Sequence, residues 1–342
     1  MNLERIAGPW VFGDDYAARV QTLASSARDR AIVDAYRRDG FVVLDDIDLT
    51  DGLDTESMWE TLGPIIAAEG QGRAQDAWRD VAAVRAIAVH EEVLRVLRLL
   101  YDREPVPFQT LNFLHGTEQP THSDFIHFST LPSGYMCGVW TALEDITLAQ
   151  GPLHYFSGSH TLPEFTYDAL GVPRVPAPYD WTNPHTRASY HAYEQAIAGL
   201  ARESGFHKHE LPIKRGRALI WSANLLHGGS PRTHPTATRK SQVTHYFFEN
   251  TLGITPMFSR PEAGEYLVRE VVDIRSAQTR PRRIDGAAAL LRDAESGLSR
   301  IRTITSPVGL AGWRAVEWAE EMAFRARRKA VYLATGTTIE RR

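Results

Sequence analysis

The sequence predicts a mainly β protein, a sandwich or barrel of short strands with helical additions at both ends. First, short aromatic or β-branched runs, separated by Gly, Pro, Asn and Ser, follow one another from Phe108 to Asn250. Second, apolar residues recur at helical spacing on both sides of this stretch. Third, a chain of 342 residues that is 43% hydrophobic and 23% charged has an ordinary globular composition. We therefore treat residues 1–342 as a single domain, although this length also allows two.

The N-terminal part, residues 17–101, is predicted to form a helical layer. Residues 17–39, "AARVQTLASSARDRAIVDAYRRD", have the spacing of one helix, and Gly40 is its stop signal. The next run, "FVVLDD", is short, β-branched and ended by acids, which predicts a strand. Residues 77–101 return to helical periodicity around "VLRVLRLLY".

The central part, about residues 105–250, is predicted to be the β core. Its strand-like runs are "FQTLNFLHG", "HSDFIHFS", "YMCGVWTALEDI", "GPLHYFSGSH", "RALIWSANLLHGG" and "SQVTHYFFEN". Residues 161–210 interrupt these runs with many prolines and tyrosines, which predicts a long irregular insertion. Long insertions of this kind often act as lids over a binding site.

The C-terminal part, residues 251–342, is predicted to be a helical extension. Residues 309–331 carry acids early and bases late, as the macrodipole of a helix favours. A basic aromatic helix can also lie on a membrane surface, but a packed helix is the better interpretation in a chain of balanced charge.

Composition excludes several classes of partner. A net charge of −4 provides no basic surface for nucleic acid, so a small-molecule substrate is the expected partner. Cys137 is the only cysteine, which excludes an internal disulfide and a thiolate metal site. The start "MNLERIAGPW" has no signal-peptide pattern, and no apolar run approaches the roughly 18–20 residues that span a bilayer. We expect a cytoplasmic protein without a membrane span, and a homo-oligomer is compatible with this sequence.

The stretch "PTHSDFIHFST" contains the first candidate metal ligands. On a strand, residues two apart point to the same face, so His122 and Asp124 would present an imidazole and a carboxylate together. The triplet alone is weak, because the chain has 13 histidines. His227 strengthens it, since it ends an apolar run and precedes two glycines, as suits a ligand at a barrel rim. Two histidines and one carboxylate favour a non-haem Fe(II) site over zinc.

The order of "RRDGFVVLDD", "HSD", "ALEDITLAQGPLHYFSGSH", "LLHGGSPR" and "TRKSQVTHYF" resembles the phytanoyl-CoA dioxygenase family of Fe(II)/2-oxoglutarate-dependent oxygenases. The resemblance spans roughly residues 30–250. It implies a double-stranded β-helix, the jelly roll of cupin-like proteins, whose mouth holds Fe(II) through His122, Asp124 and His227. It also implies a dioxygenase that uses 2-oxoglutarate and O2 to hydroxylate a small organic molecule, with release of succinate and CO2. Related halogenases lack the carboxylate ligand, so Asp124 points away from halogenation.

The resemblance also implies an arginine that pairs with the far carboxylate of 2-oxoglutarate. Arg239 fits this place, because a guanidinium can bind a carboxylate through two parallel hydrogen bonds. Arg232 is nearer to His227 but lies in the turn "GGSPRTHP", so it ranks second.

Further contacts to 2-oxoglutarate follow from position in the family. Ser241 lies two residues after Arg239 and would share its face of a strand. Many relatives have a serine two residues after the distal histidine, whereas this chain has Gly229 there and Ser230 one step later. Gln109 and Asn112, on the strand before the metal motif, are the remaining candidates.

The other histidines have simpler interpretations. His127 would face away from His122 on a regular strand, while His207 and His209 form a same-face pair without a third ligand in an exposed strand. His154 and His160 are expected to be structural. Two alternatives to a dioxygenase stay open: a non-catalytic β-helix that binds a small molecule, and a cupin-type metal isomerase or hydrolase.

Overall fold

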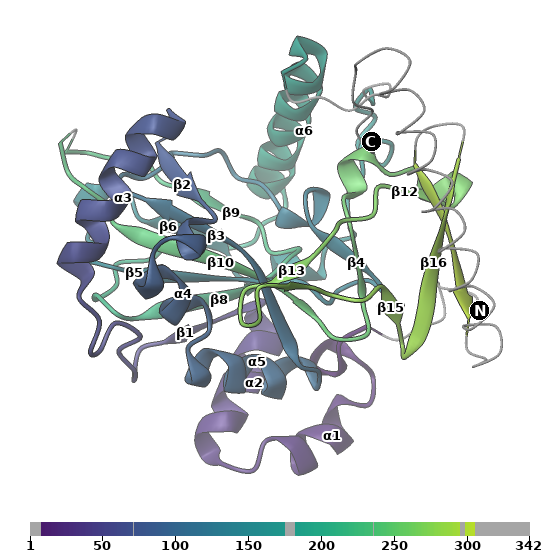
Figure 1. The fold of residues 1–342 in the computed structure, drawn as a ribbon, viewed down its shortest axis with the longest axis horizontal. Coiled ribbons are helices and arrows are strands. Elements are labelled where there is room, and N and C mark those ends of the chain that lie inside the picture. Colours follow the sequence, from purple (N-terminus) through teal and green to yellow (C-terminus); the bar gives the residue numbers. More distant parts are fainter. Residues whose placement is uncertain (1–7, 71, 175–181, 235, 295–297, 305–342) are drawn as a thin grey trace, which may run out of the picture.

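The computed structural model describes residues 8–70, 72–174, 182–234, 236–294 and 298–304. In these ranges the chain is mainly β, with helices packed on the strands (Figure 1). Short 3-10 helices occur at Trp10–Phe12, Ala77–Arg79, Asp124–Ile126, Leu148–Gln150, Ser159–Thr161, Pro256–Phe258 and Pro261–Ala263.

A six-stranded sheet forms the centre, in the order β1-β8-β5-β10-β3-β2 with all neighbours antiparallel. Residue His245 lies opposite Gly138 on one side and Gln109 on the other, which sets the register around the candidate site. The strands are β1 (Phe41–Leu44), β2 (Arg73–Gln75), β3 (Pro105–Phe113), β5 (Cys137–Ala142), β8 (Ala218–Ser222) and β10 (Ser241–Phe248).

Helices cover one face of this sheet, which we call the outer face. Their apolar residues pack against outward-facing strand residues such as Val139, Ile220 and Tyr246. The predicted helix over 17–39 is two helices, because the Ser26 side chain accepts a hydrogen bond from the Asp29 N–H and starts a new one. Gly40 ends the second at φ 80°, as predicted. The helices are α1 (Tyr16–Leu23), α2 (Ala27–Asp39), α3 (Thr55–Glu69), α4 (Ala82–Ala88) and α5 (Glu91–Tyr101).

A three-stranded sheet, in the order β7-β6-β9, packs on the opposite, inner face. Phe41 of β1 meets Tyr155 of β6 with ring centroids 4.3 Å apart, which joins the two sheets. The mixture of Trp, Tyr, Leu and Ile between them is the core expected when two sheets stack face to face. The strands are β6 (Leu153–Phe156), β7 (Lys208–Glu210) and β9 (His227–Gly229).

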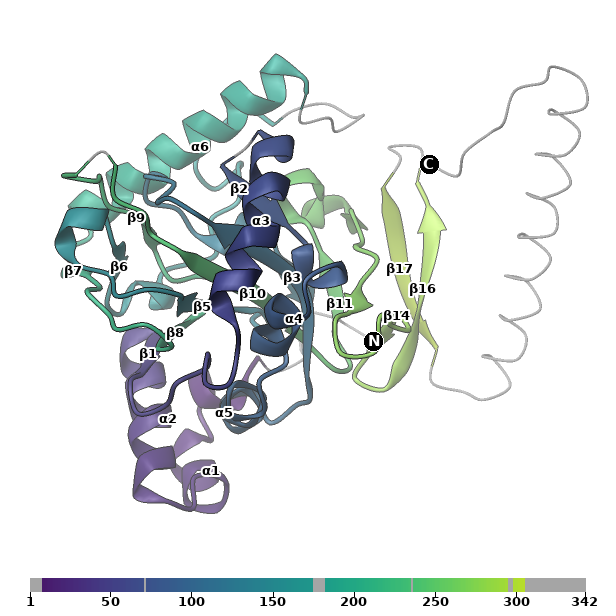
Figure 2. The ribbon, with the colours of Figure 1, turned by 60° about the vertical axis from the view of Figure 1, so that its left-hand side comes forward.

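The insertion over 161–210 is less irregular than predicted. Its second half is α6 (Pro184–Glu203), which Asn183 caps through its side chain and Pro184 begins. Tyr193 and Ile197 of α6 pack against Ile126 and Leu226, so the helix lies along the side of the molecule that carries the metal motif (Figure 2). Residues 175–181 lie outside the described residues.

The predicted helical extension is wrong for residues 252–304, which form strands, turns and two short 3-10 helices wherever the structure describes them. Asp285 and Gly286 both have positive φ and make a tight Asp-Gly hairpin turn between β15 and β16. In Figure 2 the β16 and β17 ribbons stand to one side of the main body. The predicted helix over 309–331 lies outside the described residues. The strands of this part are β11 (Leu252–Ile254), β12 (Glu265–Tyr266), β13 (Val272–Asp273), β14 (Gln278–Thr279), β15 (Arg283–Ile284), β16 (Ala287–Asp293) and β17 (Ser299–Ile304). The earlier strand β4 (Ser129–Leu131) pairs with β11.

Within the described ranges, none of the helices combines the length and the apolar character needed to cross a membrane.

Candidate active site

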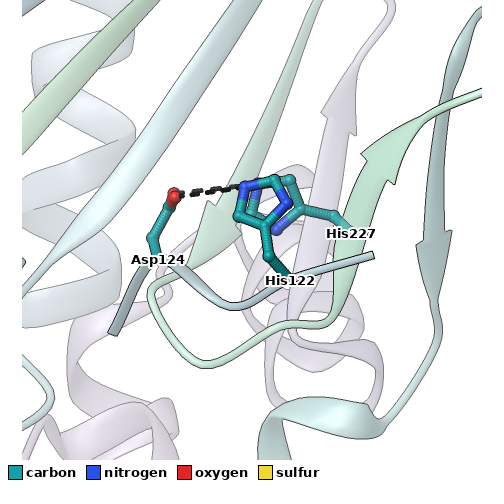
Figure 3. A group of neighbouring side chains, drawn as sticks. All are labelled: His122, Asp124 and His227. Atoms are coloured by element: carbon teal, nitrogen blue, oxygen red, sulfur yellow. Dashed lines mark ion pairs between the residues drawn. The ribbon is translucent and has the colours of Figure 1, made fainter. Parts of the chain in front are cut away.

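The metal motif lies at the inner face, where two segments far apart in sequence pair with each other. The His122 N–H donates to the His227 carbonyl at 2.9 Å, and the His227 N–H donates back at 3.0 Å. Asp124 is not on the same strand as His122, contrary to the prediction, because it begins the 3-10 turn Asp124–Ile126. The Ser123 side chain caps this turn and donates to the Ala223 carbonyl at 3.0 Å. The turn directs the carboxylate toward both histidines (Figure 3).

The three side chains form a compact, buried group. One ligand atom from each lies within 4.8 Å of the other two. The Nε2 atoms of His122 and His227 are 3.7 and 3.8 Å from the Asp124 carboxylate oxygens (Figure 3). All three residues are buried. Two imidazoles and one carboxylate at this spacing can bind one face of a metal ion.

Backbone carbonyls orient both imidazole rings. The Nδ1 of His122 lies 2.9 Å from the Pro120 carbonyl, and the Nδ1 of His227 lies 2.9 Å from the Leu225 carbonyl. A carbonyl only accepts, so each Nδ1 carries the proton and each Nε2 keeps its lone pair. The lone pairs therefore belong to the atoms that face Asp124, as a metal site requires.

The protonation states also suit a divalent cation. Burial alone would raise the pKa of the Asp124 carboxyl, but His227, His245 and His122, together with a hydrogen bond from Trp221, lower it to about 2. Burial, followed by the neighbouring His227, lowers the pKa of His122. At neutral pH Asp124 is therefore a carboxylate and the His122 imidazole is uncharged, which are the metal-binding forms of these two side chains.

Two residues that the sequence analysis did not single out position Asp124. The Trp221 Nε1–H donates to the Asp124 Oδ2 at 2.9 Å. His245 lies with its Nε2 3.8 Å from the same oxygen and its Nδ1 3.0 Å from the Gln109 Oε1. His245 lies four residues after Ser241 on β10, so both side chains point to the same face of the strand. This spacing could have identified His245 from the sequence.

Arg239 has the environment expected of a carboxylate-binding residue. It is 2% exposed, and its Nη1–H donates to the Gly151 carbonyl at 2.6 Å, while its buried Nε has no partner. The guanidinium lies against Gly116, where an added Cβ would be 3.0 Å from Cζ. Burial, and then the charge of Arg232, lower the pKa of Arg239 to about 10. Arg232 itself is paired with Glu118 at 2.8 Å.

Comparison with known proteins identifies the family. The model of the phytanoyl-CoA dioxygenase (PhyH) family matches residues 36–241, which is more than half of the chain. The chain belongs to the phytanoyl-CoA dioxygenase family. Phytanoyl-CoA dioxygenase domain-containing protein 1 of Mus musculus is 28% identical to it over 167 residues. That match covers 47% of this chain and 51% of the mouse protein, so the chain spans about half the length of this relative.

The comparison with solved structures concerns the fold. The non-haem α-ketoglutarate-dependent carbocyclase SnoK from nogalamycin biosynthesis has a TM-score of 0.50 and 14% identity, covering 67% of this chain and 87% of that one. EctD from S. alaskensis, solved with 2-oxoglutarate and 5-hydroxyectoine, has a TM-score of 0.44 and 20% identity, covering 65% of this chain and 76% of that one. The likeness to SnoK places this phytanoyl-CoA dioxygenase family member among proteins of that fold.

The remaining predicted contacts divide between the two faces of the central sheet. Gln109 lies on the inner face, since it meets His245. Ser241 shares that face, two residues after Arg239, and its hydroxyl donates to the Arg239 carbonyl at 3.3 Å. Asn112 was predicted at the site, but strand alternation turns it to the outer face, where it donates to Gln242 at 3.2 Å.

Ser230 is buried close to the arginine but is already partnered. Its hydroxyl donates to Glu210 at 2.6 Å and lies 3.4 Å from the His154 Nδ1. A Cβ built on Gly151 would lie 2.4 Å from the carbonyl oxygen of Ser230. The backbone of Ser230 is therefore next to Gly151, whose own carbonyl accepts the hydrogen bond from Arg239.

The histidines predicted to be outside the metal site are outside it. The His127 Nε2 lies 2.9 Å from the Tyr190 hydroxyl, and the His154 Nε2 lies 2.9 Å from the Thr121 hydroxyl. The His160 Nε2 contacts the Arg37 carbonyl at 3.1 Å. The pair His207 and His209 lies at the small strand β7, and His207 is exposed, as predicted.

Proposed function

We propose that this protein is a non-haem Fe(II)/2-oxoglutarate-dependent dioxygenase that hydroxylates a small organic molecule. Family membership supports a dioxygenase. Two features together carry the proposal. The first is a group of two lone-pair-bearing Nε2 atoms and a carboxylate at one point. The second is the buried guanidinium of Arg239, whose Nε has no hydrogen-bond partner among the described residues. A cupin-type isomerase or hydrolase would need the metal ligands but not Arg239.

His122, Asp124 and His227 would hold the Fe(II) ion. Arg239 would pair with the far carboxylate of 2-oxoglutarate, since a buried guanidinium with a free Nε–H is built to accept a charged partner. Gln109, Ser241 and Ser230 are secondary candidates for contacts with the co-substrate. When bound, iron and 2-oxoglutarate with O2 would supply the oxidant that removes hydrogen from the substrate, releasing succinate and CO2.

The protein's own residues would orient the ligands and exclude water. Trp221 fixes the Asp124 carboxylate through a hydrogen bond of 2.9 Å, and the Pro120 and Leu225 carbonyls fix the two imidazole rings. Burial of the whole group strengthens its electrostatic interactions and would protect a reactive intermediate from solvent.

We also propose a double-stranded β-helix for the catalytic core at about residues 105–250. The stacking of the six-stranded and three-stranded sheets supports this architecture. We further propose that the insertion over 161–210, which includes α6, works as a lid. The hydrogen-bond distance between Tyr190 of α6 and His127 supports a coupling of this segment to the site.

Two measurements test the function. Under argon, titration of 2-oxoglutarate into Fe(II)-loaded protein should produce the visible charge-transfer absorbance of a metal chelate. In air the same mixture should convert 2-oxoglutarate to succinate, slowly without substrate, while the argon sample produces none. A sensor would bind 2-oxoglutarate or another ligand without forming succinate. An isomerase or hydrolase would turn over in argon as well as in air. Either result contradicts the proposal.

A further inference from the structure

A second arginine lies one aromatic ring away from the metal group. Arg269, which follows β12, has its Cζ 4.7 Å from the centroid of the Phe128 ring and 6.0 Å from that of Phe108. The Phe128 ring is 4.9 Å from the His245 ring, and the His245 Nε2 is 3.8 Å from Asp124. A small molecule that reaches the metal group could therefore also reach Arg269.

A third arginine approaches from the edge of the same sheet. Arg73 on β2 lies opposite Phe113, which lies opposite Ser241 on β10, so alternation places Arg73 on the inner face. Its Nε is buried without a partner. Arg269 and Arg73 both act electrostatically on the His245 ring, and Asp124 acts on it with the opposite sign.

Neither guanidinium has an acid within ion-pair distance among the described residues. The acids whose charges act on them lie beyond that distance: Glu69, which acts on Arg73, accepts from the Gln75 N–H at 3.2 Å, and Asp76, which acts on Arg269, accepts from the Thr110 N–H at 3.1 Å. Burial lowers the pKa of both arginines. A partly buried guanidinium without a carboxylate costs folding free energy, so its presence beside a site favours an anionic ligand.

The loaded metal group would not pair with these two arginines. With a divalent ion and the two carboxylates of 2-oxoglutarate bound, Asp124 and Arg239 bring its charge to zero. Glu69 and Asp76 act on Arg73 and Arg269 only from beyond ion-pair distance. Among the described residues, each guanidinium is therefore without a carboxylate in direct contact.

We propose that the substrate carries an oxyanion, a carboxylate or a phosphate, that is bound by Arg269 with Arg73, while its apolar part lies against Phe108 and Phe128. Guanidinium groups bind such anions through parallel hydrogen bonds, and an aromatic wall holds the adjoining carbon skeleton. This inference rests on the proposed function, because it assigns the anion to the substrate of the same site. It makes Arg269 a specificity-determining residue.

The test uses anionic and uncharged probes that share a phenyl ring. Fe(II)-loaded protein with saturating 2-oxoglutarate, held under argon, is titrated with phenylacetate, phenyl phosphate, phenylacetamide and benzyl alcohol. Binding is followed by the change in the chelate absorbance and by the midpoint of thermal unfolding. We expect at least one anion to bind roughly 10- to 100-fold more tightly than its uncharged counterpart. Preference between phenylacetate and phenyl phosphate identifies the oxyanion.

Variants assign the effect to the arginines. Arg269→Gln and Arg73→Gln should remove the preference for the anion, and Arg269→Lys should keep part of it. The matched control is Arg38→Gln, whose side chain is 70% exposed and pairs with Asp39. All four variants should bind 2-oxoglutarate as the wild type does.

The outcomes separate the two proposals. Absence of the chelate absorbance in the wild type would refute the oxygenase function itself. If 2-oxoglutarate binds normally but the anions bind no better than the uncharged probes, the inference about the substrate is wrong. If Arg269→Gln abolishes the binding of 2-oxoglutarate, then Arg269 serves the co-substrate and the inference is equally wrong.

Discussion

The outer and inner faces of the six-stranded sheet differ in the charge state of their buried ionisable groups. On the outer face these groups are neutral: burial raises the pKa of Tyr36, Tyr101 and Cys137. The Tyr36 and Tyr101 hydroxyls bond to each other at 2.7 Å, and the Tyr246 hydroxyl donates to the Ala88 carbonyl at 2.8 Å. Helices therefore satisfy the hydroxyl groups that they cover.

The inner face keeps charged groups in the buried state. The Asp124 carboxylate is ionised, with its pKa at about 2, and the buried Arg239 Nε has no acceptor. Native structures leave few buried polar atoms unsatisfied, so a buried guanidinium with an unpartnered donor marks a place where a ligand completes the pairing. Substitutions on the outer face should therefore change folding stability, and substitutions on the inner face should change binding.

The largest effect is expected at the metal group. Asp124→Ala removes the only carboxylate of the group and should weaken Fe(II) or Co(II) binding by more than about 100-fold, because a three-ligand face cannot lose a member and keep its geometry. His122→Ala and His227→Ala should behave alike. The measurement is anaerobic titration calorimetry with either ion.

The matched control for the metal group is His209→Ala, which changes a histidine on β7 that does not belong to the metal group. Its metal affinity should equal that of the wild type. If His209→Ala loses the metal while His122→Ala retains it, the assignment of the site is wrong.

The next effect separates the co-substrate from the metal. Arg239→Ala would leave the far carboxylate of 2-oxoglutarate buried without its partner, which corresponds to a loss of about 2–5 kcal/mol, or roughly 30- to several-thousand-fold in affinity. Arg239→Lys should recover part of it, because an ammonium provides a point charge in place of a two-pronged contact. Metal binding should be unchanged. The chelate absorbance under argon reports the dissociation constant.

The control for Arg239 is Arg232→Ala, which breaks a surface pair with Glu118 and should leave the affinity for 2-oxoglutarate near normal. A large loss in Arg232→Ala with none in Arg239→Ala would move the role to Arg232.

A substitution on the outer face tests whether that face contributes to folding stability and not to binding. Leu97 of α5 is 0% exposed, so Leu97→Ala should lower the free energy of unfolding by about 2–5 kcal/mol through the cavity that it leaves. At a temperature where the variant is folded, its affinity for metal and for 2-oxoglutarate should match the wild type. Chemical denaturation and the two titrations measure these quantities. A large loss of metal affinity in the folded variant would show that the two faces are energetically coupled.

The positions of the main strands and the members of the metal group were largely predictable from sequence, because local patterns indicate them. The runs around Phe108, Cys137, Ala218 and Ser241 all contain strands, and Gly40 ends a helix as expected. The convergence of the ligands was predicted for a partly wrong reason. His122 and Asp124 come together through a capped 3-10 turn and a bridge to His227, and neither feature is visible as a period of two.

Features that depend on contacts distant in sequence were missed. The side chain of Asn112 was assigned to the site because sequence position alone does not say which face of a strand is inside. Residues 252–304 were expected to be helical, although the Asp285-Gly286 turn signal was present. Trp221 was not singled out, because a buried indole becomes a positioning group only when the fold brings a carboxylate to its N–H.

Trp221→Phe sharpens the comparison with a smaller effect on the inner face. Phenylalanine keeps most of the ring volume but removes the hydrogen bond of 2.9 Å to the Asp124 Oδ2. Groups that orient a metal ligand typically contribute about 10- to 100-fold to affinity, so metal binding should fall by that factor. Stability should fall by only about 1 kcal/mol. Calorimetry with Co(II) and chemical denaturation measure the two effects, and a loss of stability without a loss of affinity would make Trp221 a core residue only.

The smallest effect concerns α6, which joins the insertion to the inner face. Tyr190→Phe removes the hydroxyl that lies 2.9 Å from the His127 Nε2 and 3.4 Å from the Gln119 Nε2. A lid should become protected when the site is loaded, since ligand contacts order it. Hydrogen exchange over residues 184–203 should therefore slow when Mn(II) and 2-oxoglutarate bind the wild type. In the loaded variant the exchange should be faster by about 2- to 10-fold, which corresponds to about 0.5–1.5 kcal/mol for one hydrogen bond.

The control for Tyr190→Phe is His191→Ala, on the exposed side of the same helix, which should exchange as the wild type does. Equal exchange in the loaded and unloaded wild type would identify α6 as a permanently packed helix, because a closing element must be less protected before its ligands bind.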